Sequence, residues 1–135
     1  RFLAEAYLGL GKTVQALELA QQALALVSQS NHLDNGRAWR VLGLVAAKLG
    51  EPVLSDVEND QRYAAAACFQ QSLDFFQEGD FERDRAFTLW RWSQLEMSQG
   101  NEKQGQALWQ EARDIFSCLN LPLMVARMEA DFAVG

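Results

Sequence analysis

The stretch that most limits the fold runs from Arg37 to Gly50 and reads RAWRVLGLVAAKLG. Its apolar residues recur at the spacing of one helix face, which predicts a helix over residues 35–49. Gly50 and Pro52 follow the last apolar position, as is typical of a helix C-terminus. Gly43 lies in mid-helix, where a small residue predicts the close approach of another backbone. The apolar face consists of Trp39, Leu42, Val45, Ala46 and Leu49.

A turn glycine recurs on both sides of this stretch. Gly11, Gly50 and Gly100 stand at intervals of 39 and 50 residues. A second column, with intervals of 49 and 40, consists of Ala20, Phe69 and Trp109. Both columns span 89 residues, so about ten extra residues lie between Gly50 and Phe69. The sequence therefore predicts an internal repeat with an insertion at about 51–61.

The apolar spacing predicts an all-α chain. Seven helices are expected, over residues 2–10, 13–28, 35–49, 61–77, 84–99, 102–118 and 121–132. Short links make neighbouring helices antiparallel, and no pair can bury its apolar face alone. We therefore expect one domain over 1–135, a right-handed α-solenoid of stacked antiparallel helix hairpins. Its expected parts are repeats at about 1–30, 35–78 and 84–118 and a terminal helix at 121–132. Because the chain begins with Arg rather than Met, we expect it to be a fragment of a larger protein.

The repeat carries a recognisable residue pattern. Trp39, Leu42, Gly43, Ala46 and Gly50 stand where W-x₂-L-G-x₂-Y and a turn glycine would place them. Ala65 and Phe69 match A-x₃-F in the next helix. The chain thus resembles the tetratricopeptide repeat (TPR) family, with a period longer than the usual length of about 34 residues. The long period is similar to repeats in large bacterial signalling and regulatory proteins. The resemblance implies a scaffold that binds protein or peptide partners.

Charge and cysteine usage exclude several classes of function. The net charge of −6 argues against binding to nucleic-acid backbone and to anionic membrane surfaces. No apolar run approaches the roughly 20 residues needed to span a bilayer. Cys68 and Cys118 lack zinc or CxxC spacing and lie in apolar helical patterns, so we expect both to be small core residues in a reducing, cytoplasmic compartment.

No residues suggest catalysis. His32 is the only histidine, and neither a triad nor metal-ligand spacing can be built around it. The segment 6–13, AYLGLGKT, matches a relaxed phosphate loop, but an amphipathic helix precedes it instead of a strand. We therefore predict a protein that is not an enzyme, with no catalytic, cofactor-binding or metal residues and no cofactor.

In stacked hairpins the first helices line the inner wall. Arginine and aromatic side chains are enriched at binding hot spots. Trp90 and Met97 have an alternative role, because they could pack against the neighbouring helix. The predicted partner-binding groove consists of Arg37, Arg40, Leu44, Phe87, Trp90, Arg91, Gln94 and Met97, with Glu5 and Leu8 from the first unit.

The insertion and the terminal helix leave alternatives open. The insertion carries Glu51, Asp56, Glu58 and Asp60; it is either an acidic flap for a basic partner or, as we favour, a solvated extension. The terminal helix has an apolar face that predicts a homodimer or further repeats. That face consists of Leu121, Met124, Val125, Met128 and Phe132.

Three function classes follow. We favour a non-enzymatic protein–protein interaction scaffold within a larger bacterial signalling or regulatory protein. The alternatives are a ligand- or peptide-sensing repeat domain and a homo-oligomerisation module.

Overall fold

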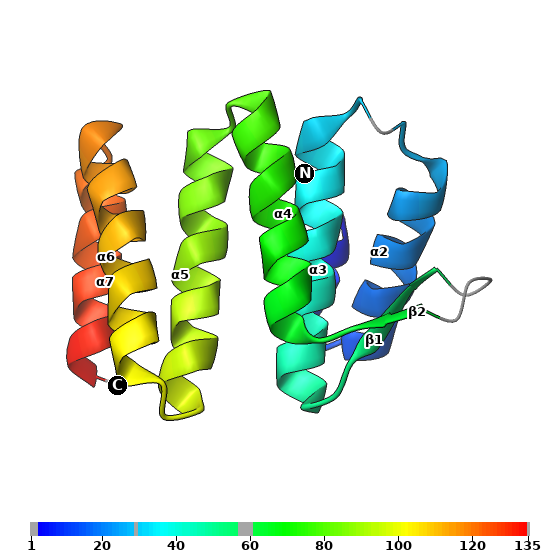
Figure 1. Cartoon of the computed structure of the whole chain (residues 1–135), viewed down its shortest axis with the longest axis horizontal. Helices are drawn as coiled ribbons and strands as arrows, with labels where there is room; N and C mark the ends of the chain where they lie inside the picture. Colours follow the sequence, from blue (N-terminus) through cyan, green and yellow to red (C-terminus); the bar gives the residue numbers. More distant parts are fainter. Residues whose placement is uncertain (1–2, 29, 57–60, 135) are drawn as a thin grey trace. The chain divides into compact units, whose positions relative to one another are not determined.

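The computed structural model describes residues 3–28, 30–56 and 61–134 of the chain (Figure 1). Within these ranges the chain forms seven helices and one β-hairpin. The helices are α1 (Leu3–Gly9), α2 (Thr13–Leu26), α3 (His32–Leu49), α4 (Ala65–Gly79), α5 (Glu82–Ser98), α6 (Glu102–Cys118) and α7 (Pro122–Val134). The strands are β1 (Val53–Asp56) and β2 (Gln61–Tyr63). The predicted all-α class and the order of its seven helices are confirmed.

The chain divides into two compact units, Arg1–Asp80 and Phe81–Gly135, and each is described by itself. In the first unit α1 packs on α2, α2 on α3 and α3 on α4. In the second unit α5 packs on α6 and α6 on α7. Each unit is therefore built from helices that pack against their neighbours in sequence, as the repeat predicts. No helix in the described ranges has both the length and the apolar character required to cross a membrane.

The repeat is also visible in the backbone conformation of the turns between helices. Gly11, Gly50 and Gly100 all have positive φ angles, of 79°, 71° and 83°, which glycine adopts without a steric penalty. Forty residues separate Asp80 and Asn120, which also have positive φ angles, of 62° and 58°. Their amides donate to the carbonyls three residues earlier, at 3.2 and 3.0 Å. The turns after α4 and α6 are therefore equivalent, at a period of 40 residues.

Two glycines of α3 make room for phenylalanine rings of α4. A Cβ atom on Gly43 would lie 2.7 Å from Cε1 of Phe69, and one on Gly36 would lie 2.4 Å from Cε1 of Phe76. Both rings are fully buried. The expectation that another backbone approaches Gly43 is therefore wrong; an aromatic ring fills that space. Ser72 adds a buried hydrogen bond from its Oγ to the Gly36 carbonyl, at 2.7 Å.

Helix α3 begins one turn earlier than predicted. Asn31 caps it, because its Oδ1 accepts a hydrogen bond from the Asp34 amide at 3.1 Å. Asn35 is buried, and its Nδ2 donates to the carbonyls of Ser28 and Asn31, both at 2.9 Å. These local hydrogen bonds stabilise a helical turn that the apolar spacing alone could not reveal.

The predicted insertion forms a β-hairpin, where no strand was expected. β1 pairs antiparallel with β2, with Val53 opposite Tyr63 and Leu54 opposite Arg62. Gln21 of α2 stabilises the hairpin, because its Nε2 donates a hydrogen bond to the Leu54 carbonyl at 2.7 Å. The Tyr63 ring meets Trp39 edge-on, with centroids 4.9 Å apart. β2 replaces the first turn of a helix predicted to start at 61, and the assignment of 51–61 as an insertion in the repeat stays a prediction.

In the α5–α6 hairpin of the second unit, the glycine at the close contact lies on the second helix, α6. In the α3–α4 pair of the first unit, the glycines lie on the first helix, α3. A Cβ atom on Gly105 of α6 would lie 2.8 Å from Cγ of Met97 and 3.1 Å from the Ser93 carbonyl of α5. At the other end, the rings of Phe87 and Phe116 meet edge-on at 5.2 Å. α5 and α6 therefore approach closely at one end and are spaced by aromatic rings at the other.

Candidate functional site

Eight of the ten predicted groove residues lie on two helices that belong to different units, and the other two, Glu5 and Leu8, lie on α1. Arg37, Arg40 and Leu44 lie on α3, and the other five lie on α5. The structure thus brings each set together on its own helix. Their predicted role in partner binding stays a prediction.

Arg40 connects three helices of the first unit. It is buried, and its Nε donates to Oε1 of Glu5 in α1 at 2.9 Å. Its guanidinium also lies 5.4 Å from the ring centroid of Phe76 in α4. Arg40 and Glu5 therefore interact with each other, while Leu8, Arg37 and Leu44 are half-buried.

Arginine and aromatic side chains alternate along α5. Arg83 lies 6.0 Å from the ring centroid of Phe87, and Arg91 lies 5.1 Å from that of Trp90. Nη1 of Arg91 donates to Oε1 of Gln94 at 3.1 Å. Trp90 itself is only 2% exposed. The accessible part, which we call the α5 stripe, consists of Arg83, Phe87, Arg91 and Gln94.

Sequence reasoning missed Arg83, although its position four residues before Phe87 places both on one helix face. Met97 packs on Gly105 of the neighbouring helix, which is one of the two roles left open for it. Trp90 is buried beneath the stripe, where it supports the guanidinium of Arg91.

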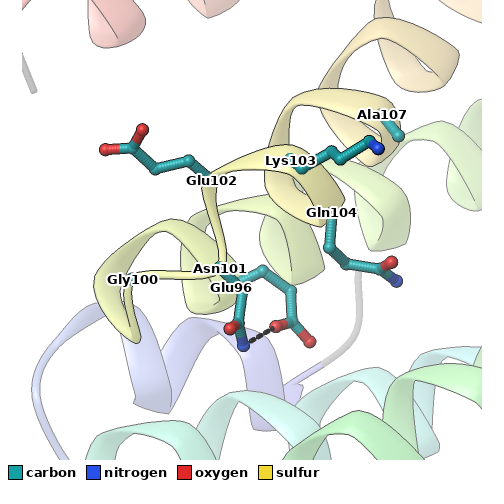
Figure 2. A pocket seen from close by; sticks show the side chains of 7 residues that line it. All are labelled: Glu96, Gly100, Asn101, Glu102, Lys103, Gln104 and Ala107. Atoms are coloured by element: carbon teal, nitrogen blue, oxygen red, sulfur yellow. Dashed lines mark hydrogen bonds between the residues drawn. The ribbon is translucent and has the colours of Figure 1, made fainter.

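An open pocket lies at the turn between α5 and α6 (Figure 2). Its buried carboxylate is Glu96, which accepts hydrogen bonds from Trp92 Nε1 at 3.0 Å and Asn101 Nδ2 at 2.7 Å. Both carboxylate oxygens of Glu96 therefore already have donors inside the protein. None of the predicted groove residues lines this pocket. Its lining consists of Glu96, Gly100, Asn101, Glu102, Lys103, Gln104 and Ala107.

Arg85 links α5 and α6 on a face separate from the stripe. Its Nε donates to Oε2 of Glu82 at 2.6 Å and its Nη1 to Oε2 of Glu111 at 3.0 Å. The hydrogen bond from Arg85 lowers the pKa of Glu82 below its usual 4.5. This stabilisation is fully present above about pH 4.5 and is lost as the pH falls through the lowered pKa. Because both side chains are partly exposed, we expect only about 0.2–1 kcal/mol from it.

His32 is the first residue of α3, and its Nε2 lies 3.2 Å from Oε2 of Glu78 in α4. Its ring also packs near Phe75, with centroids 6.0 Å apart. Across the described ranges, no group of three or more His, Cys, Asp or Glu side chains is placed to hold a metal ion. His32 therefore contributes to the packing of α3 on α4.

The two cysteines differ in accessibility. Cys68 is fully buried in α4, and desolvation raises the pKa of its thiol to about 12. At about pH 8 the thiol of Cys68 therefore stays protonated and unreactive. Cys118 is exposed at the end of α6, so the expectation that it is a core residue is wrong.

We expect the folded chain to react with one equivalent of a thiol reagent such as DTNB, at Cys118. In guanidinium chloride both thiols should react. The Cys118→Ser variant should lose the fast reaction in the folded state. Rapid labelling of two thiols in the folded protein would contradict the burial of Cys68.

The acidic insertion is only partly described. Glu51 and Asp56 are exposed, whereas Glu58 and Asp60 lie outside the described residues. Whether the insertion binds a basic partner stays a prediction.

The apolar residues of the predicted terminal helix differ in their burial. Met124 and Met128 are buried, and Leu121 and Val125 are half-buried. Phe132 is 49% exposed, and its ring lies 5.1 Å from that of Trp109.

Comparison with known proteins gives no relative for this arrangement: no family model, curated protein or solved structure matches the chain.

Proposed function

We propose that this chain is a non-catalytic protein-interaction module of TPR-like hairpins, and that the α5 stripe binds a protein or peptide partner. The observation that carries the proposal is the arrangement of Arg83 and Arg91 beside the rings of Phe87 and Trp90. Arginine and aromatic residues are the types most enriched at binding hot spots.

The contacts with the aromatic rings also orient the two arginine side chains before a partner binds. A guanidinium held beside a ring gains about 0.5–1 kcal/mol at an exposed site. It also loses less side-chain entropy when a partner arrives, which reduces one of the main costs of association. Arg91 is further oriented by its hydrogen bond to Gln94.

The stripe favours a partner of particular chemistry. It presents two positive charges and a half-buried ring on a chain whose net charge is −6. Arg83 is exposed, and its guanidinium lies beside the ring of Phe87. An acidic segment with an apolar side chain would complement both features. The TPR resemblance supports a role as a scaffold inside a larger bacterial signalling or regulatory protein.

Selection from a display library of random peptides on the full chain tests the proposal. We expect enriched peptides to combine Asp or Glu with an apolar residue. The Arg83→Glu substitution should then weaken their binding about tenfold or more, which corresponds to about 1.4 kcal/mol. Fluorescence anisotropy on labelled peptides would measure the dissociation constants.

Lys103→Glu provides the matched control, because it makes the same charge change at an exposed position of the same unit. It should weaken binding much less than Arg83→Glu. If no peptide is enriched, or if the two variants weaken binding equally, the α5 stripe is not the binding surface.

A further inference from the structure

The α5 stripe is a single row of side chains along most of its length. Arg83, Phe87 and Arg91 follow one another at intervals of four residues, which is the spacing of neighbours on one helix face. Thr88 and Trp90 lie on either side of this row, and both are buried. The surface that a partner can reach is therefore a narrow line along α5, with a positive charge, an apolar ring and a second positive charge in that order.

The length of this line matches an extended peptide chain. An interval of four residues covers about 6 Å along the helix axis, because an α-helix rises about 1.5 Å per residue. An extended segment presents alternate side chains to one side at a spacing of about 6.7 Å. An acidic, an apolar and a second acidic residue at alternate positions would therefore reach Arg83, Phe87 and Arg91 in turn.

A partner helix suits the narrow line less well. A helix with its side chains is about 10–12 Å across, whereas neighbouring extended chains lie only about 4.8 Å apart. Three contacts along one row would order about nine residues of a helix but only about five of an extended segment, and each ordered residue loses conformational entropy. A flexible segment therefore loses less entropy if it binds the stripe in an extended form.

This chain does not itself supply a suitable segment. Two acidic residues four positions apart with an apolar residue midway occur once in the sequence, at Asp74, Phe76 and Glu78. That segment is helical, and Phe76 is buried in α4. A second copy of the chain would present the same buried ring, so the occupant is a different protein.

We propose that the α5 stripe binds an extended segment of another protein with the pattern acid-x-apolar-x-acid, where acid is Asp or Glu and x is any residue. This proposal rests on the proposed function, because it assigns a partner sequence to the same surface. One carboxylate pairs with Arg83, the apolar side chain covers the Phe87 ring, and the second carboxylate pairs with Arg91.

The random-peptide selection on the full chain tests the spacing. In the enriched peptides, two acidic residues should stand four positions apart with an apolar residue midway. Moving the apolar residue by one position keeps the composition but turns it to the opposite side of an extended segment, and it should weaken binding about fivefold or more. Enriched peptides with acidic residues seven or eight positions apart would overturn the extended form and leave the proposed function intact.

Charge exchange tests which carboxylate meets which arginine. In the tightest-binding peptide, each of the two acidic residues is replaced in turn with lysine, and fluorescence anisotropy measures binding of both peptides. The Arg83→Glu chain should prefer one of these peptides about tenfold, and the Arg91→Glu chain should prefer the other. Because the two peptides are compared on the same chain, a change in the stability of that chain does not alter the preference.

Lys103→Glu is the matched control, since it makes the same charge change at an exposed position of the second unit and should favour neither peptide. A preference of both arginine variants for the same peptide, or no preference in either, would overturn the proposed pairing. A selection that enriches no peptide at all would instead contradict the proposed function together with this inference.

Discussion

Replacing Phe69 with alanine is expected to lower the free energy of unfolding by about 3–5 kcal/mol. The ring is fully buried in α4 and fills the space beside Gly43 of α3. Its removal loses the transfer free energy of the ring and leaves a cavity that close-packed neighbours cannot fill completely. Urea unfolding followed by circular dichroism would measure the loss.

Leu26→Ala is the control for this substitution, because Leu26 is 86% exposed. It should change the unfolding free energy by less than about 0.5 kcal/mol. An effect of Phe69→Ala as small as that of the control would mean that the ring does not hold α3 and α4 together.

Replacing Gly43 with alanine is expected to destabilise the chain, although alanine is the better helix former. Alanine gains up to about 1 kcal/mol in helix propensity over glycine. The added Cβ would lie 2.7 Å from a ring that is itself fully buried. Overpacking of this kind costs about 1–3 kcal/mol, so we expect a net loss of about 1–2 kcal/mol.

Gly9→Ala is the matched control for Gly43→Ala. Gly9 also lies in a helix, but a Cβ atom there would have no neighbour within 4 Å. This variant should be as stable as the parent chain or more stable. A stabilised Gly43→Ala chain in thermal unfolding would contradict the close contact with Phe69.

Most of the fold could be predicted from the sequence, because the apolar period and the turn glycines are local signals. Gly11, Gly50 and Gly100 mark three turns, and all have the positive φ that favours glycine. The start of α3 was missed because its cap depends on the side chain of Asn31 rather than on an apolar face. The hairpin was missed because tertiary contacts, such as Gln21 with Leu54, stabilise its two short strands.

Less of the candidate site could be predicted. Helical periodicity places a residue on a face, but it cannot show which side chains pair there. Arg40 was expected to be available to a partner, yet it is buried beside Glu5 and Phe76. Arg83 was overlooked, yet it is exposed beside Phe87. Glu96 is buried, and only the structure shows its donors, Trp92 and Asn101.

The most direct test of the repeat architecture combines Gly43→Ala and Phe69→Ala in a double-mutant cycle. If the small residue on α3 exists to receive the ring of α4, Gly43→Ala should destabilise the parent chain. In the Phe69→Ala background it should instead stabilise the chain by up to about 1 kcal/mol, because only helix propensity remains. The same effect of Gly43→Ala in both backgrounds would show that α3 and α4 are not held together by this contact.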